Sequence, residues 1–405
     1  MMKRNISIII FFVIVMNSCL EAQNISPLFP CTEKMEDAYG VCAHLTRKDW
    51  DWEIHKEEIL HIKQAGAQFV RADWDYRKVD ENSIYGWLDS VMESMKTNKV
   101  QMLGILSTPW KSYPWKDIRS YHDFINYNLK HFDGRVNYWE VLNEINLISS
   151  NDSLPLLYTK LLKEVYPKIK EINPGNKVLL SGLCETTDGF LEKICRYEAY
   201  KYFDIVNFHS YYLPEDLKIH FEIIRKCMDK YGWEKPVWIS ELGMHTCREK
   251  DSWRTEDAQA RIVARYHLIA FAYGVDKVFW YNFRSFEKDD KDPESHFGLT
   301  HKDLSPKPAY LAYQTMTKMC PSGSTRPTLI KKGDIYLSGW ICPNKQFVWA
   351  IWKAKGSSDI KLNIRGTFVL KDYMGATVKR TNKTTIRVSS GVTYIIGAKR
   401  VEFTY

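Results

Sequence analysis

Hydrophobic and polar residues alternate along most of this chain between two spacings, one typical of buried strands and one typical of amphipathic helices. Apolar residues run almost without interruption through residues 39–45. In the next segment, residues 51–66, they recur every three or four positions, and the pattern stops at Gly66. Residues 67–74 are again apolar and extended. The pattern therefore predicts successive strand and helix units.

Counted along the chain, the pattern predicts eight strands, at residues 39–45, 67–74, 100–110, 135–144, 177–183, 203–212, 236–243 and 275–283. A helical segment follows each of them, the last at residues 305–319. Eight such units are typical of the (β/α)8 TIM barrel of the α/β class, in which the active site lies at the C-terminal ends of the strands. A doubly wound open sheet is the alternative, but it usually has fewer strands, and no glycine-rich phosphate loop follows the first strand.

The pattern changes after Cys320. Residues 321–405 contain short strand-like segments separated by Gly, Asn and Lys turns, without a helical period. They predict a small C-terminal antiparallel β-sandwich domain, and residues 31–319 are assigned to the barrel. Because no linker or low-complexity tract separates the two parts, we expect them to form a firm interface.

Residues 1–22 have the composition of an export signal. Lys3 and Arg4 precede an apolar run that ends at residue 16, and small polar residues follow. The segment "VMNSC" resembles a bacterial lipobox, in which Cys19 would be acylated; cleavage nearer Gln23 is the alternative. We therefore expect an exported protein that is periplasmic, secreted, or held at the cell surface by a lipid anchor to the membrane through Cys19.

Composition excludes some functional classes. The formal net charge of +8 comes from Lys and Arg residues scattered along the chain without a basic run, which argues against nucleic acid as a partner. The cysteines beyond Cys19 form no closely spaced CxxC pair, so no zinc site is predicted, and no cofactor motif is present. A disulfide between Cys31 and Cys42 is one pairing that export would permit. The 14 Trp and 24 Tyr residues suit stacking on sugar rings, but they also suit a large core.

Polar residues gather where the predicted strands end. Glu144 ends the fourth strand, after an apolar run, and Glu241 ends the seventh. In an eight-stranded barrel these two ends face each other across the mouth, and a pair of carboxylates that flanks a sugar bond is the machinery of glycoside hydrolysis. Further candidates near strand ends are Arg71, Trp74, Trp110, Asn143, His209, Tyr211, Trp280 and, after the first strand, His44.

Several motifs resemble those of one group of enzymes. "YWEVLNE" and "VWISELG" resemble the acid/base and nucleophile signatures of the clan A glycoside hydrolases, which are retaining (β/α)8 barrels with their two Glu on strands four and seven. "FVRADW", "FHSYY" and "HFGLTHKDLSPKPAYLAYQTM" resemble other segments of the clan. The resemblance covers residues 35–319, and the appended sheet domain is similar to that of family 39; a family 5-like enzyme is the alternative. "ELGMHT" lacks the aromatic residue that commonly follows the nucleophile in family 39.

The resemblance implies a retaining enzyme that cleaves β-glycosidic bonds in an oligo- or polysaccharide. It implies that Glu241 is the nucleophile and Glu144 the acid/base. Arg71 would hold Glu241 ionised, and Asn143 would bind the 2-hydroxyl of the sugar.

The resemblance also suggests the residues that contact the sugar. His209 and Tyr211 would orient it as hydrogen-bond donors, and Trp280 would form a platform under the reacting ring. Contacts at the rim are expected from Trp110, Trp74 and His44. Two alternatives stay open: a surface glycan-binding lipoprotein without turnover, and a transglycosylase that uses the same site.

Overall fold

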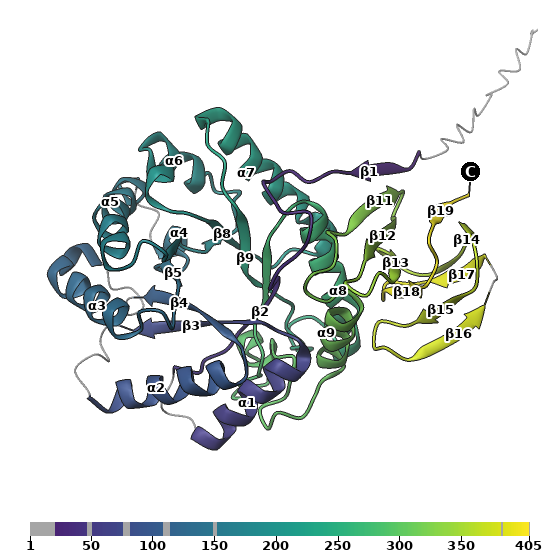
Figure 1. The fold of residues 1–405 in the computed structure, drawn as a ribbon, viewed down its shortest axis with the longest axis horizontal. Coiled ribbons are helices and arrows are strands. Elements are labelled where there is room, and N and C mark those ends of the chain that lie inside the picture. Colours follow the sequence, from purple (N-terminus) through teal and green to yellow (C-terminus); the bar gives the residue numbers. More distant parts are fainter. Residues whose placement is uncertain are drawn as a thin grey trace, which may run out of the picture.

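The computed structural model of the protein describes residues 21–46, 51–75, 82–107, 114–148, 152–381 and 384–404. Its largest sheet is parallel and curls into a barrel (Figure 1). In chain order its strands are β2 (Tyr39–Cys42), β3 (Phe69–Asp75), β4 (Gln101–Ser107), β5 (Tyr138–Val141), β6 (Lys177–Leu179), β7 (Leu183–Cys184), β8 (Val206–Ser210), β9 (Val237–Leu242) and β10 (Lys277–Trp280).

Two short strands share one position in this barrel. β6 and β7 are consecutive pieces of residues 177–184; β6 pairs with β5, and β7 pairs with β8. Isolated bridges between Asn143 and Gly182 and between Leu179 and Ile205 join the two flanks across the interruption. The sheet therefore closes with eight strand positions, and the predicted TIM barrel is confirmed.

The floor of the barrel is filled by side chains. Alternate residues of the strands point inward and form one apolar layer, in which large rings dominate. The layer consists of Cys42, Phe69, Leu103, Leu179, Ile205, Trp238 and Phe279, with Tyr138 and Tyr281 packed against it. This layer closes the interior of the barrel below the mouth.

Helices cover the outside of the barrel. The first begins after Asp51, whose side chain accepts a hydrogen bond from the Glu53 N–H, and it ends at Gly66, which has a φ of 89°. The helices are α1 (Trp52–Ala65), α2 (Asn82–Thr97), α3 (Ile118–His131), α4 (Ile145–Ile148), α5 (Leu154–Ile172), α6 (Phe190–Arg196), α7 (Lys218–Tyr231), α8 (Glu256–Ala272) and α9 (Pro308–Met319), with 3-10 turns η2 (Pro114–Lys116), η3 (Ala199–Tyr202), η4 (Pro214–Asp216) and η5 (Pro293–His296). Within the described ranges, none of these helices combines the length and hydropathy needed to cross a membrane.

The C-terminal region forms two antiparallel sheets, as the turn-rich sequence predicts (Figure 1). The larger sheet has the strand order β1-β11-β12-β13-β18-β15-β16, and the smaller has the order β17-β14-β19. They enclose their own apolar core, which includes Leu337, Ile351, Phe368 and Ile395. The strands are β1 (Gln23–Ile25), β11 (Thr328–Lys332), β12 (Ile335–Ile341), β13 (Phe347–Lys353), β14 (Ser358–Ile364), β15 (Phe368–Lys371), β16 (Thr377–Thr381), β17 (Thr385–Val388), β18 (Thr393–Ile396) and β19 (Val401–Phe403).

The other face of the larger sheet packs on the barrel. Tyr336, Trp352 and Tyr394 of this face belong to the same apolar cluster as the residues of α8 and α9. Polar contacts cross the same boundary: Arg265 of α8 donates to the Ser390 carbonyl at 3.2 Å, and Trp352 Nε1 donates to Glu215 at 3.1 Å. A continuous apolar cluster with polar contacts at its edge is the firm interface that the missing linker suggested.

Strand β1 was not anticipated from the sequence. It pairs antiparallel with β11 at the edge of the larger sheet, with Gln23 opposite Lys331 and Ile25 opposite Leu329. Figure 1 shows it beside β11, at the upper edge of the sandwich in this view. The sandwich thus includes a strand from before the barrel, which the boundary at residue 321 leaves out.

The structure also corrects the suggested disulfide. Cys42 points into the barrel, where its thiol donates to the Ser240 carbonyl at 3.2 Å. Cys31 lies instead near Arg326 and Asp276, and all eight described cysteines are free thiols. The pairing of Cys31 with Cys42 is therefore wrong, because the two side chains face different surroundings.

Candidate active site

Glu241 lies at the end of β9 and is 7% exposed. Both of its carboxylate oxygens accept hydrogen bonds: Nη1 of Arg71 donates to Oε1, and the Tyr211 hydroxyl donates to Oε2 at 2.6 Å. Each oxygen of the Glu241 carboxylate is thus held by a donor of its own. Burial and the nearby charge of Glu241 raise the pKa of Tyr211 well above its usual range, so this phenol stays a donor.

Arg71, on β3, links the carboxylates of two other strands. Its Nε and Nη2 donate to the two oxygens of Glu140 at 2.8 and 2.9 Å, and Nη2 also donates to Asn143 Oδ1 at 2.6 Å. Burial would lower the pKa of Arg71, but the charges of Glu140 and Glu241 outweigh it and raise that pKa. The guanidinium therefore acts as a fixed positive charge that aligns Glu241 and Asn143.

Glu140 was missed by the sequence analysis. It is fully buried, and besides Arg71 it accepts a hydrogen bond from the Gly182 N–H at 2.7 Å. Strand periodicity offered a signal, because Glu140 lies two residues after the inward-facing Tyr138 and is an acid in the middle of an apolar strand.

Glu144 follows β5 at a sharp bend. Leu142 and Glu144 have φ values of 67° and 44°, a backbone region that non-glycine residues seldom adopt and that is common at functional sites. His209 Nδ1 lies 2.8 Å from Glu144 Oε1. Burial raises the pKa of Glu144, but the hydrogen bond and charge of His209, together with the charge of Arg71, outweigh it and hold that pKa below its usual value.

The two candidate carboxylates lie close together. One oxygen of Glu144, one oxygen of Glu241 and a ring nitrogen of His209 are all within 4.8 Å of one another. Carboxyl groups about 5 Å apart are typical of retaining glycosidases, whereas inverting enzymes hold them roughly 6.5–9.5 Å apart to admit a water molecule. A metal ion could use the same three donors, but Arg71, which is bonded to Glu241, would compete with a cation there.

His209 depends on a glycine for its position. The ring is fully buried on β8, and its Nε2 lies 3.0 Å from the Ser240 hydroxyl. A Cβ atom at Gly182 would lie 2.0 Å from that Nε2. Only glycine at position 182 leaves room for the imidazole in this orientation.

Asn143 is half-buried beside Arg71. Arg71 occupies its Oδ1, and its Nδ2 makes no hydrogen bond within the described part of the chain. The amide N–H group is therefore available to an oxygen of a bound molecule.

The structure corrects the assignment of Trp280. This side chain is 0% exposed and packs against Tyr266 of α8, on the outer face of β10, so it cannot lie under a sugar. Tyr281, the next residue, faces inward; its ring packs on Phe297 and Tyr211, with centroids 5.3 and 6.3 Å apart. Tyr281 thus takes the place at the mouth that was assigned to Trp280.

Trp74 is also misassigned. It is 3% exposed and packs on Phe132 and Trp139, between the barrel and the end of α3, because residues 70, 72 and 74 of β3 face outward. His44, by contrast, lies near the mouth, with its ring centroid 5.0 Å from Phe286 and 6.4 Å from Tyr281. Trp110 lies outside the described residues.

A fourth carboxylate, that of Glu294, extends the site. Tyr281 donates from its hydroxyl to Glu294 of η5 at 3.1 Å. Partial burial raises the pKa of Glu294; the Tyr281 hydrogen bond lowers it, while the charges of Glu241 and Glu144 raise it again. No periodic pattern points to Glu294, because it lies in a long loop after the last barrel strand.

Fold and site together define a class of protein: a (β/α)8 barrel with an appended sandwich and two opposed glutamates at its mouth. Solved structures of this architecture include a family 39 glycoside hydrolase from the gut symbiont Bacteroides cellulosilyticus WH2, which is 20% identical, has a TM-score of 0.74, and covers 90% of this chain and 81% of its own. A glucosidase from Croceicoccus marinus is 13% identical, with a TM-score of 0.66 over 96% of this chain and 100% of its own.

A monomeric beta-xylosidase from Caulobacter crescentus CB15 is 11% identical, with a TM-score of 0.65 over 93% of this chain and 98% of its own. No protein-family model and no curated protein sequence matches the chain. The protein therefore has the fold of the family 39 glycoside hydrolases, in agreement with the family 39-like resemblance of its motifs. At these identities the likeness concerns the fold, and the activity has to be argued from the site.

Proposed function

We propose that the protein is a glycoside hydrolase that cleaves β-glycosidic bonds in an oligo- or polysaccharide by a retaining, double-displacement mechanism. The proposal rests on one observation: the carboxylates of Glu144 and Glu241 project from opposite strands of the barrel mouth with oxygens within 4.8 Å. This spacing suits direct attack on the anomeric carbon.

In the first step, a Glu241 oxygen attacks the anomeric carbon while the Glu144 carboxyl gives its proton to the departing glycosidic oxygen. The bond between the anomeric carbon and that oxygen breaks, and a covalent glycosyl–enzyme ester forms. In the second step, Glu144, now a carboxylate, takes a proton from water, the water oxygen attacks the same carbon, and Glu241 leaves. Two inversions give net retention.

The surrounding side chains fit these roles. Arg71 and Tyr211 orient Glu241 through its two oxygens. Asn143 presents its free Nδ2 to the sugar, where a hydrogen bond to the 2-hydroxyl would strengthen in the transition state. His209 contacts Oε1 of Glu144, and Tyr281 supplies an aromatic surface beside Tyr211.

The proposal is tested by hydrolysis of a panel of aryl β-glycosides, including glucoside and xyloside because solved proteins of this fold carry those names. Proton NMR of the first-formed sugar, before mutarotation, should show the β anomer. An α product would contradict the retaining mechanism, and no turnover of aryl glycosides or of plant, fungal and host polysaccharides would favour a glycan-binding protein. Transfer to an added sugar in preference to water would indicate a transglycosylase.

We also propose that the protein is exported, with residues 1–22 as the signal and Cys19 as the candidate acylated residue. Residues 1–20, Cys19 among them, lie outside the described residues, so the proposal rests on sequence alone. Cell fractionation and mass spectrometry of the mature N-terminus test it. A Cys19→Ala variant that stays on membranes would contradict the lipid anchor.

A further inference from the structure

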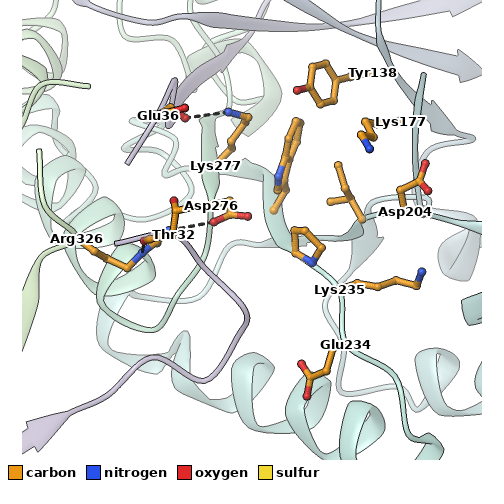
Figure 2. A pocket seen from close by; sticks show the side chains of 13 residues that line it. Thr32, Glu36, Tyr138, Lys177, Asp204, Glu234, Lys235, Asp276, Lys277 and Arg326 are labelled. Carbon is orange, nitrogen blue, oxygen red and sulfur yellow. Dashed lines mark hydrogen bonds and ion pairs between the residues drawn. The ribbon is translucent and has the colours of Figure 1, made fainter. Parts of the chain in front are cut away.

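A cavity of about 440 Å³ opens at the end of the barrel opposite the mouth (Figure 2). Its lining comes from residues at or just before the N-terminal ends of strands, such as Tyr138 of β5, Lys177 of β6, and Lys235 and Pro236 before β9. The catalytic glutamates lie at the opposite, C-terminal ends of β5 and β9. The cavity is therefore separate from the candidate active site.

Two lysines lie on one side of this cavity without a counter-ion. Among the described residues, neither Lys177 nor Lys235 forms an ion pair with a carboxylate; the Lys235 ammonium lies 5.3 Å from the centroid of the Phe203 ring. Figure 2 shows the two side chains on either side of Asp204. Burial lowers the pKa of Lys235, which indicates that its ammonium has lost part of its water shell.

The carboxylate between them is already engaged. Asp204 accepts hydrogen bonds from the Lys170 ammonium at 2.7 Å, the Val178 N–H at 2.8 Å and the Tyr166 hydroxyl at 3.0 Å. Asp204 is thus paired with Lys170, and it reaches Lys235 only through its charge. Lys177 and Lys235 therefore leave an excess of positive charge at this side of the cavity.

The other acidic residues of the lining do not correct that excess. Glu234 forms a two-point ion pair with Arg225, and Asp276 pairs with Arg326 at 3.0 Å. Glu36 is exposed at the far side, near Lys277.

Lys277 differs from the two free lysines because the fold already holds it. Its ammonium donates to the carbonyls of Glu36 and Asp37 at 3.1 and 2.9 Å and lies over the rings of Phe69 and Trp238. Burial lowers the pKa of Lys277 to about 8. We assign Lys277 to the closure of the barrel floor and not to a ligand.

We propose that this cavity binds a small oxyanion of the phosphate or sulfate class, free or as an ester, through the ammonium groups of Lys177 and Lys235. Lysine binds such groups as a point charge. The Lys235 ammonium is partly buried and would gain from a counter-ion, and Lys177 is exposed at the edge of the cavity. An ester could extend along Pro236 and Trp238, which continue the lining from Lys235. The inference does not depend on the proposed glycosidase activity.

The binding test uses the full-length protein at low ionic strength, where the attraction is least screened. Isothermal titration calorimetry would compare inorganic phosphate and sulfate with glucose 6-phosphate, glucose 6-sulfate and glucose. Lys177→Gln and Lys235→Gln should each weaken oxyanion binding by about tenfold or more, the usual effect of losing a charge-assisted hydrogen bond. Lys226→Gln, at an exposed lysine of α7, is the matched control and should bind like wild type.

Binding of the inorganic ions as tightly as of the esters would identify a free anion as the ligand, and tighter binding of an ester would identify a sugar ester; either supports the proposal. Absence of saturable oxyanion binding, binding of uncharged glucose alone, or a Lys177→Gln and Lys235→Gln double variant that binds like wild type would overturn it.

A footprint on the unaltered protein gives a second measurement that does not depend on the folding of any variant. Acetic anhydride labels accessible amines, and mass spectrometry locates the products. Phosphate should slow acetylation at Lys177 and Lys235 but not at Lys226. Equal rates with and without phosphate would count against the site.

Discussion

His209 Nδ1 lies 2.8 Å from Oε1 of Glu144. The same nitrogen is 3.6 Å from Oε2 of Glu241, so one edge of the imidazole faces both candidate catalytic carboxylates. A change in the protonation of Glu144 would therefore act on a ring that also lies beside Glu241.

This contact predicts the pH dependence of activity. Glu144 must be protonated for the first step, and its pKa is held below the usual value, so kcat/KM should fall as pH rises and the optimum should be acidic. His209→Phe removes the hydrogen bond that favours the carboxylate, so the pKa of Glu144 should rise and the falling limb should move to higher pH. The measurement is a pH profile of kcat/KM with a nitrophenyl glycoside.

A substrate with a dinitrophenyl leaving group is the control for this profile, because it needs little protonation and should lose the falling limb. An unchanged limb in His209→Phe would contradict the assigned contact. The lowered pKa also has a consequence for folding: the stability that ionised Glu144 contributes is present above its unfolded pKa and is lost as pH falls through the folded value.

Replacing Glu241 and replacing Glu144 should impair different steps of the reaction. Glu241→Ala removes the attacking group, so turnover should fall by several orders of magnitude on every substrate, and added azide should give an α-glycosyl azide. Glu144→Ala removes the proton donor. A dinitrophenyl glycoside should still form the covalent ester, and azide should then give the β-glycosyl azide.

NMR of the azide products distinguishes the two roles. The same anomer from both variants, or near-normal polysaccharide turnover in either, would contradict the assignment. Treatment with EDTA is a further check: if Glu144, His209 and Glu241 serve as acid, orienting ring and nucleophile, wild-type activity should be unchanged.

Arg71 should matter for both stability and activity. Arg71→Met leaves Glu140 and Glu241 buried without their shared cation, which typically costs about 3–5 kcal/mol. The double variant Arg71→Met with Glu140→Gln removes one of the unpaired charges and should recover part of the melting temperature. Activity should stay low in both variants, because neither aligns Glu241. Recovery of kcat with stability would show that Arg71 has a structural role alone.

Substitutions of the neighbouring residues Trp280 and Tyr281, at the end of β10, should have different effects on substrate binding. Tyr281→Ala removes a ring beside Tyr211 and should raise KM for every substrate. Glu294→Gln should alter the preference among sugars that differ in one hydroxyl. A hydrogen bond to a charged group contributes about 1.5–3 kcal/mol, which sets the size of that change. Trp280→Phe is the matched control, since its side chain faces α8. It should lower the melting temperature and leave KM near wild type.

Strand parity explains which of these residues the sequence could have identified. In β3, Phe69 and Arg71 face inward, so Trp74 falls on the outer face. In β10, Phe279 faces inward, which places Tyr281 at the mouth and Trp280 on the outer face. Trp280 and Trp74 lie near strand ends, as the resemblance requires, but counting alternate positions places both on the outer face of the barrel. The eight strands could be predicted from their apolar periodicity. The two glutamates could be identified because buried strands that end in carboxylates are rare.

Other features depend on contacts that sequence spacing does not contain. Glu241 departs from simple alternation after the inward-facing Trp238, because the register between β8 and β9 shifts at residues 208 and 209. Glu294 and Gly182 reach the site from a long loop and from the break between β6 and β7. Their roles follow only from the closed barrel.

The sandwich should stabilise the barrel. A chain that ends at Cys320 would expose the apolar surface of α8 and α9 and leave Arg265 and Glu215 without Ser390 and Trp352. We expect it to be insoluble or to melt at a lower temperature. A truncated chain that stays folded and fully active, together with polysaccharide binding by the isolated sandwich, would contradict this view. Trp352→Ala is a milder test and should lower the melting temperature without changing KM.

The pairing of β1 with β11 determines how the molecule would respond to a mechanical load. Any pull transmitted through the segment that precedes Gln23 would act first on a strand of three residues at the edge of the sandwich. That strand could detach from β11 while the closed ring of parallel strands stayed intact. A tether at this end of the chain would therefore load the sheet edge before β2 and the barrel, and β1 would detach before the strands that carry the glutamate pair came under load.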